Sequence, residues 1–90
     1  SRMDRVKQKI TCVLSTDQMG IIIRAADETR MIVAKSMNAV FRTLVPHLSS
    51  TRKEELSYTA MRSKSYSIEE RDKEAAILAL EKMIKKIKEY

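Results

Sequence analysis

The chain has 90 residues, which is the length of one domain. Its hydrophobic residues make up 43% of the sequence, as in an ordinary globular protein, so a disordered chain is not expected. No run approaches the roughly 18 apolar residues of a membrane span, the first ten residues are too polar for a signal peptide, and a single cysteine excludes an internal disulfide. We therefore expect one domain over residues 1–90 in a reducing interior, cytoplasmic or nuclear, with Ser1 and Arg2 as a cloning remnant.

The formal net charge is +6, and the excess lies toward the N-terminal half. Residues 1–50 carry eight Lys and Arg against four Asp and Glu, whereas residues 51–90 carry ten against eight. Such a balance favours polyanionic partners, and the alternative is a charged surface that only keeps the chain in solution.

The segment 3–14 fits two structures. Apolar residues fall near helical spacing at Met3, Val6, Ile10 and Val13. Apolar residues also alternate with their neighbours at Ile10, Cys12 and Leu14, which is the spacing of a strand. The segment is therefore predicted as either a short helix or a strand.

Residues 16–45 form the clearest helical stretch, with Ser15 or Thr16 available as the N-cap. Apolar residues recur at helical spacing at Met19, Ile22, Ile23, Ala26, Val33, Met37, Val40, Phe41 and Leu44. This pattern fits one long helix or two helices broken near 30–36, and Pro46 is expected to end it.

A short helix is predicted over residues 51–62, because Thr51 and Glu54 have the spacing of a capping box. Only Leu56, Ala60 and Met61 are available to anchor it. Few apolar anchors make this helix marginal.

Another helix is predicted over residues 67–89, where Ser67 and Glu70 repeat the capping-box spacing. Its apolar residues are spaced four, three, four and three at Ala76, Leu80, Met83, Ile87 and Tyr90, and the stripe is widened by Ile77 and Ile84. We expect residues 67–90 to be an oligomerisation helix that uses Ala76, Leu80, Met83, Ile84 and Ile87.

The inventory of reactive side chains argues against an enzyme. His47 is the only histidine and follows Pro46 in a polar connection, and Cys12 fits a small buried hydrophobe better than a nucleophile. Gly20 is the only glycine, so no glycine-rich phosphate loop can form. We expect no catalytic residue, no metal site and no cofactor.

The basic residues near the N-terminus are more informative. Arg5, Lys7 and Lys9 alternate with Val6, Gln8 and Ile10, so in a strand the three cations share one face with Thr11 nearby. A two-stranded ribbon of this kind fits the major groove of DNA.

The order KITCVLSTDQMGIIIRAADETR, followed by KSMNAVFRTL, resembles the ribbon-helix-helix repressors of the Arc and Mnt type. The resemblance covers about residues 7–45, and it implies a strand that pairs with its dimer mate and two helices after it. It implies that Lys9, Thr11 and Val13 face DNA, although Val13 stands where a polar base reader is usual. It also implies that Ser36 caps the second helix, next to Asn38, and that the trailing helix 67–89 resembles a tetramerising extension.

We therefore expect an all-α class: a small helical domain of three to four helices, with the segment 3–14 as a short helix or a dimer-pairing strand. The expected function is that of a non-enzymatic DNA-binding regulator, such as a repressor or a plasmid or phage accessory factor, acting as a homodimer or higher oligomer. Residues 3–50 would bind DNA, through Arg5, Lys7, Lys9, Thr11, Ser36 and Asn38. The alternative is a helical module that binds another protein through its Met and Ile stripes and has no nucleic-acid role.

Overall fold

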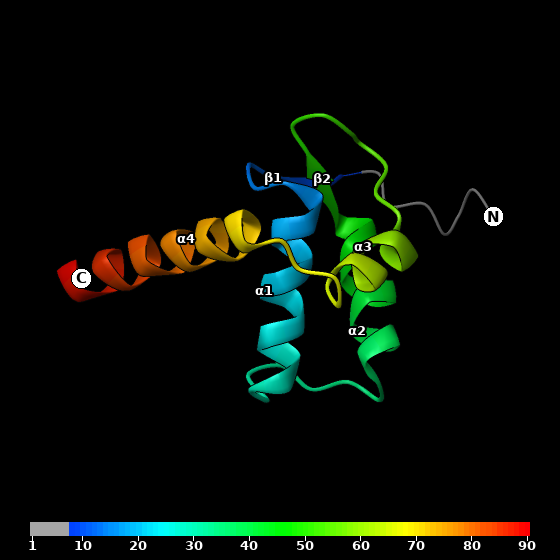
Figure 1. Ribbon diagram of the computed structural model, residues 1–90, viewed down its shortest axis with the longest axis horizontal. Coiled ribbons are helices and arrows are strands. Elements are labelled where there is room, and N and C mark those ends of the chain that lie inside the picture. Colours follow the sequence, from blue (N-terminus) through cyan, green and yellow to red (C-terminus); the bar gives the residue numbers. More distant parts are fainter. Residues whose placement is uncertain (1–7) are drawn as a thin grey trace.

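The computed structural model describes residues 8–90 and shows a mostly helical chain with one small sheet (Figure 1). The elements in chain order are β1 (Ile10–Cys12), α1 (Thr16–Glu28), α2 (Met37–Leu44), η2 (Val45–His47), β2 (Leu48–Ser50), α3 (Tyr58–Lys64) and α4 (Glu70–Glu89). The helices α1, α2 and α3 pack together beside the sheet, whereas α4 leaves this body and projects to one side (Figure 1). A small helical domain is therefore confirmed.

Helix α1 begins where the sequence predicts. Ser15 is the N-cap, and its side chain accepts a hydrogen bond from the backbone N–H of Gln18, while the Gln18 side chain accepts one from the N–H of Ser15. This reciprocal pair is a capping box, which satisfies two amides that the first turn would leave without partners. Met19 and Ile23 lie on the buried face of the helix.

Of the two alternatives for residues 16–45, the structure has two helices, and α1 ends in a Schellman motif. The N–H of Arg30 donates to the carbonyl of Asp27, and the N–H of Met31 donates to the carbonyl of Ala26. These are the two bonds that define the motif. Arg30 has φ 62°, the left-handed conformation that the motif requires and that glycine more often supplies.

Helix α2 runs back along α1 from its N-cap Ser36, whose side chain accepts a bond from the N–H of Ala39. It ends before Pro46, as predicted, and a single 3-10 turn leads into β2. Two residues of the predicted apolar face are exceptions. Val33 is exposed because it lies in the connection between the helices, and Leu44 lies partly exposed at the end of α2.

The segment 3–14 is extended over β1, while residues 3–7 lie outside the described residues. The strand pairs in parallel with β2 of the same chain, in the register Ile10↔Leu48, Thr11↔Ser49 and Cys12↔Ser50. The sequence did not predict β2, since three residues with two serines carry no strand periodicity. The helical hairpin of α1 and α2 provides the crossover between the two parallel strands.

The predicted helix 51–62 is wrong in its first half. Residues 51–57 form a loop, and α3 begins only after Ser57, whose side chain accepts a bond from the N–H of Ala60. Thr51 and Glu54 form no capping box; the hydroxyl of Ser50 instead accepts hydrogen bonds from the N–H groups of Arg52 and Lys53. The local turn therefore excludes a helix at this point.

The predicted helix 67–89 is nearly correct, but α4 begins at Glu70 and Ser67 does not cap it. Glu69 is the N-cap without a side-chain hydrogen bond. Ala76 is 2% exposed where α4 packs against α1, so it is part of the chain's own core. Its assignment to an oligomer contact is therefore wrong.

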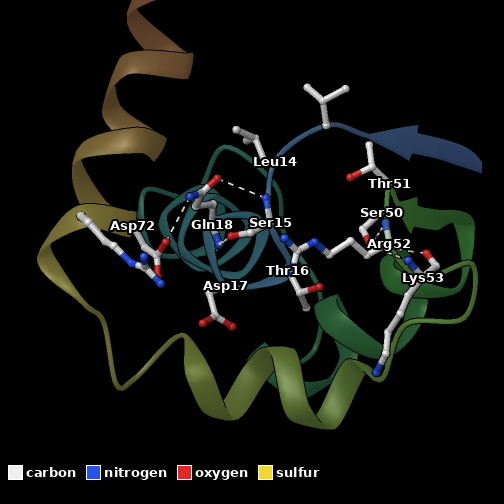
Figure 2. Close-up of a pocket in the computed structure, with 12 residues that line it drawn as sticks. Leu14, Ser15, Thr16, Asp17, Gln18, Ser50, Thr51, Arg52, Lys53 and Asp72 are labelled. Carbon is white, nitrogen blue, oxygen red and sulfur yellow. Dashed lines mark hydrogen bonds between the residues drawn. The ribbon is translucent and has the colours of Figure 1, made fainter.

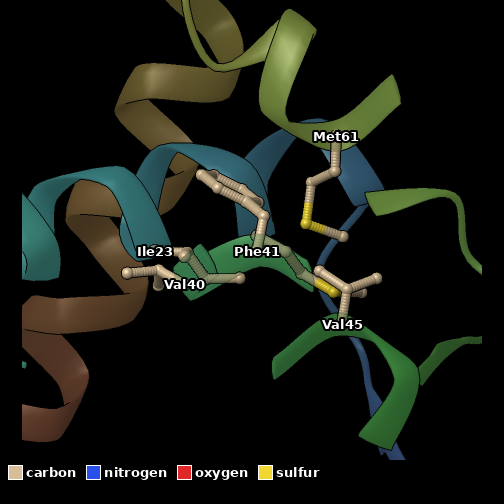
Figure 3. Close-up of a cluster of buried hydrophobic side chains, with 6 residues drawn as sticks. Ile23, Val40, Phe41, Val45 and Met61 are labelled. Atoms are coloured by element: carbon tan, nitrogen blue, oxygen red, sulfur yellow. The ribbon is translucent and has the colours of Figure 1, made fainter. Parts of the chain in front are cut away.

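The main core lies where α1, α2, η2 and α3 meet (Figure 3). Its buried side chains are Met19, Ile23, Val40, Phe41, Val45 and Met61. Phe41, Val45 and Met61 are completely buried, and Phe41 is the largest of them. Two of the six are methionines, whose flexible side chains fill space that aromatic rings would occupy in other cores.

Gly20 permits the close contact between α1 and α3. A Cβ atom at this position would lie 2.9 Å from the carbonyl oxygen of Met61 and 3.1 Å from its Cγ atom. The oxygen is backbone and cannot move without shifting α3. A helical glycine normally costs stability, but here it allows the two helices to pack.

We expect Gly20→Ala to lower the free energy of unfolding by about 1–3 kcal/mol, because the added methyl group overpacks the contact with α3. Chemical denaturation of the full chain measures the change. The matched control is Ala25→Gly on the exposed side of α1, which removes a methyl group and should cost about 1 kcal/mol through helix propensity alone. A Gly20→Ala protein more stable than the wild type would contradict the close packing.

Candidate nucleic-acid interface

An open cleft of about 750 Å³ lies at the carboxyl ends of the two parallel strands (Figure 2). The residues that follow β1 and β2 form two of its walls, and the start of α4 contributes Arg71 and Asp72. The N-terminus of α1 opens into the same space. The carboxyl edge of a parallel sheet, next to a helix N-terminus, is a common place for a ligand in proteins with parallel sheets.

One wall of the cleft is held by a chain of hydrogen bonds that links α1 to α4. The Gln18 side chain that closes the capping box at Ser15 also donates from Nε2 to the Oδ1 atom of Asp72 at 3.0 Å. Asp72 is only 6% exposed, so this bond satisfies a buried carboxylate. Gln18 thereby fixes the first turn of α4 against the first turn of α1 (Figure 2).

The opposite wall is a tight turn after β2 that presents two cations. The Ser50 hydroxyl accepts hydrogen bonds from the N–H groups of Arg52 and Lys53, at 3.3 and 3.0 Å, and the N–H of Ser50 donates to the carbonyl of Lys53 at 2.8 Å. In Figure 2 the Arg52 side chain extends across the cleft toward Thr16, while Lys53 points away from it. Within residues 8–90 neither cation takes part in a salt bridge.

The charges of the cleft are mixed, with a cationic excess. Arg52, Lys53 and Arg71 line it together with Asp17 and Asp72. The carboxylate of Asp72 is bonded inward to Gln18, and Arg71 is highly exposed beside Glu69 at 3.3 Å. The positive end of the α1 dipole adds to the cations. The arrangement is suited to holding an anionic group such as a phosphate between the turn and the helix.

The predicted base readers of β1 are engaged within the chain, and Arg5 and Lys7 lie outside the described residues. Lys9 donates from Nζ to the carbonyl oxygen of Glu54 at 3.0 Å and lies 3.1 Å from a carboxylate oxygen of Glu55, and its side chain is 9% exposed.

Thr11, the next residue on the same face of β1, is bonded across the sheet. Its Oγ1 atom lies 3.0 Å from the hydroxyl of Ser49. Lys9 and Thr11 therefore both contact the segment 49–55 of their own chain, and Thr11 is exposed.

Ser36 and Asn38 lie at the opposite end of the helical hairpin from β1 (Figure 1). Ser36 is the N-cap of α2, as the resemblance implies, and Asn38 follows in the first turn. The structure therefore does not bring these two residues together with Lys9 and Thr11 within one chain.

The residues that sequence reasoning missed are Arg52, Lys53 and Arg71. The run from Ser49 to Thr51 contains three hydroxyl residues before two cations, which is a turn signal. The capping-box spacing of Thr51 and Glu54 pointed to a helix instead. Arg71 carries no local signal, since only the packing of α4 on α1 brings it to the cleft.

Two other reactive side chains of residues 8–90, those of His47 and Cys12, do not line the cleft. His47 is exposed and Cys12 is half-buried against the core. No three His, Cys, Asp or Glu side chains in this part of the chain gather to hold a metal ion, and none of its helices is both long and apolar enough to cross a bilayer. Comparisons with protein families, with curated proteins and with solved structures give no match.

We expect Lys9→Ala to lower the free energy of unfolding by about 1–2 kcal/mol, because it removes a charged donor from the carbonyl of Glu54 and frees the loop after β2. The exposed ion pair with Glu55 should add little. Urea denaturation measures the loss, and Lys53→Ala is the matched control with an expected change near zero. Unchanged stability of the Lys9→Ala protein would show that this contact does not hold the loop.

Proposed function

We propose that the chain is a small non-enzymatic DNA-binding regulatory protein, and that the cleft beside β1 and β2 binds the phosphate backbone of DNA. The observation that carries this proposal is the position of the exposed Arg52–Lys53 turn opposite the N-terminus of α1. Backbone N–H groups at a helix start and an arginine fork are standard phosphate ligands in DNA complexes.

The distribution of charge supports a polyanionic partner. Residues 8–68 carry nine Lys and Arg against five Asp and Glu, whereas residues 69–90 carry six of each. The cationic excess of the described residues therefore belongs to the body that contains the cleft. Such an excess speeds association with DNA and makes the affinity depend on salt.

The resemblance to ribbon-helix-helix repressors gives partial support. An extended β1, a break between α1 and α2 and a serine cap on α2 agree with that family's order of elements. In that family, however, the strand pairs with a second chain to form the ribbon that enters the groove. Here β1 pairs with β2 of its own chain, so the proposed contact rests on the cleft and not on a ribbon.

A second candidate function is the binding of another protein with no role for DNA. One observation favours it: the apolar face of α4 is exposed beyond its contact with α1. Binding of this kind would tolerate salt and would depend on apolar residues of α4 rather than on cations of the cleft.

We expect the double substitution Arg52→Gln and Lys53→Gln to weaken binding to duplex DNA about tenfold or more at about 0.1 M salt, because it removes the cation that extends across the cleft and a second exposed cation of the same turn that points toward the surface beside it. The slope of log affinity against log salt should also become shallower by about 2. Fluorescence anisotropy with a labelled duplex, repeated over a series of salt concentrations, measures both quantities.

The matched control is Lys82→Gln with Lys85→Gln on the projecting part of α4, which removes the same charge at a distance from the cleft. This protein should retain the wild-type salt slope. Equal losses from the two pairs would mean that net charge alone attracts the duplex, and a lack of duplex binding by the wild type would remove the proposal.

A further inference from the structure

A second pocket, of about 390 Å³, adjoins the cleft along the turn that follows β2. Residues 50–53, which form this turn, line both the cleft and the second pocket, so the turn is the wall between them. The cleft takes its other residues from the end of β1 and from the starts of α1 and α4. The second pocket instead takes them from the sheet and the loop, and they are Lys9, Thr11, Ser49 and Glu54.

The turn between the two sites is narrow, and it carries cations on two sides. The N–H of Ser50 donates to the carbonyl of Lys53 at 2.8 Å, and the Ser50 hydroxyl accepts from the N–H of Lys53 at 3.0 Å. These bonds bring the first and last residues of the turn together. In Figure 2 the side chains of the two neighbouring cations diverge, since Arg52 extends across the cleft and Lys53 points away from it. Lys53 also lines the second pocket.

The second pocket contains a pair of hydroxyl groups that can donate one further hydrogen bond. The Oγ1 atom of Thr11 lies 3.0 Å from the hydroxyl oxygen of Ser49. A bond between two hydroxyls uses only one of their two hydrogens, so the other hydrogen is available to a ligand. Ser49 is 7% exposed, whereas Thr11 is exposed, so the pair extends from the buried side of the pocket to the solvent. Hydroxyl donors of this kind are common ligands of phosphate oxygens.

The charges around the second pocket leave a positive excess. Three cations, Lys9, Arg52 and Lys53, line it together with one acidic residue, Glu54. The charge of Lys9 is balanced by the carboxylate of Glu55, which lies 3.1 Å from its Nζ atom. The excess therefore comes from the turn, and it is suited to an anionic group that also accepts hydrogen bonds.

We propose that the second pocket binds the phosphate that follows the one in the cleft, on the same strand of DNA. This inference rests on the proposed function and names the part of the nucleic acid that the chain contacts. Two consecutive phosphates of one strand would lie on the two sides of the turn, with only one sugar between them. Lys53 supplies the charge for the second phosphate, and the Thr11 and Ser49 hydroxyls supply a neutral donor.

The double variant Thr11→Val and Ser49→Ala tests the neutral donors. Because both partners of one hydrogen bond become apolar groups of similar shape, the stability of the fold should change little. The affinity for a labelled DNA duplex should fall about tenfold, as expected for the loss of a hydrogen bond to a charged group. The slope of log affinity against log salt should not change, since the variant removes no charge. Fluorescence anisotropy over a salt series measures both quantities, and circular dichroism checks the fold.

The matched control is Thr59→Val. The Thr59 hydroxyl belongs to another hydroxyl pair, 3.1 Å from that of Ser57, and it lines neither the cleft nor the second pocket. Its loss should leave the affinity for the duplex unchanged. An equal loss of affinity in Thr59→Val would mean that the effect does not come from the pocket, and it would overturn the inference.

Single substitutions in the turn test whether two phosphates are bound. Lys53→Gln and Arg52→Gln should each make the salt slope shallower by about 1, because each cation neutralises a different phosphate. Both side chains are exposed, so neither change should disturb the fold. If the two cations held the same phosphate, the double variant would change the slope by only about 1 in total.

The outcomes separate this inference from the proposed function. A total slope change of about 1, or wild-type affinity in the Thr11→Val and Ser49→Ala protein, would overturn the second phosphate contact and leave the contact in the cleft. A wild type that binds no duplex would remove the proposed function, and the second contact with it.

Discussion

The end of α1 at Glu28 is the constraint on which the rest of the fold depends. Two backbone hydrogen bonds close this end and turn the chain at Arg30, so that α2 can run back along α1 and deliver β2 beside β1. If α1 continued to Leu44 as one straight helix, its far end would lie roughly 40 Å from β1. The parallel sheet, the turn after β2 and the cleft between them would not form.

The position of α3 follows from the side chains that pack between it and the hairpin of α1 and α2. Phe41 is the only phenylalanine, and it is completely buried between α1 and α3 together with Met61. Gly20 lets α3 approach α1 closely enough to cover these side chains. This core contains one aromatic ring and two methionines, whose flexible side chains can fill gaps in several conformations. The close contact between α1 and α3 therefore helps to hold these side chains in one arrangement.

Local signals predicted some elements well and others badly. The cap at Ser15, the stop before Pro46 and the long C-terminal helix each depend on residues within one or two turns, and the structure has them. The strand β2 was missed because its pairing with β1 is the only reason for its extended conformation. The helix expected from Thr51 is absent because the Ser50 hydroxyl accepts hydrogen bonds from the N–H groups of Arg52 and Lys53 and closes a turn there.

In the candidate site, too, the sequence predicted what local patterns determine and missed what the tertiary structure determines. Alternation correctly placed Lys9 and Thr11 on one face of a strand, since both contact the segment 49–55. Periodicity identifies a face, but it cannot say whether DNA, a second chain or the chain itself covers that face. Arg52 and Lys53 reach the cleft through a turn, and turns position side chains without a repeating pattern. Sites of this kind are visible only once the elements are assembled.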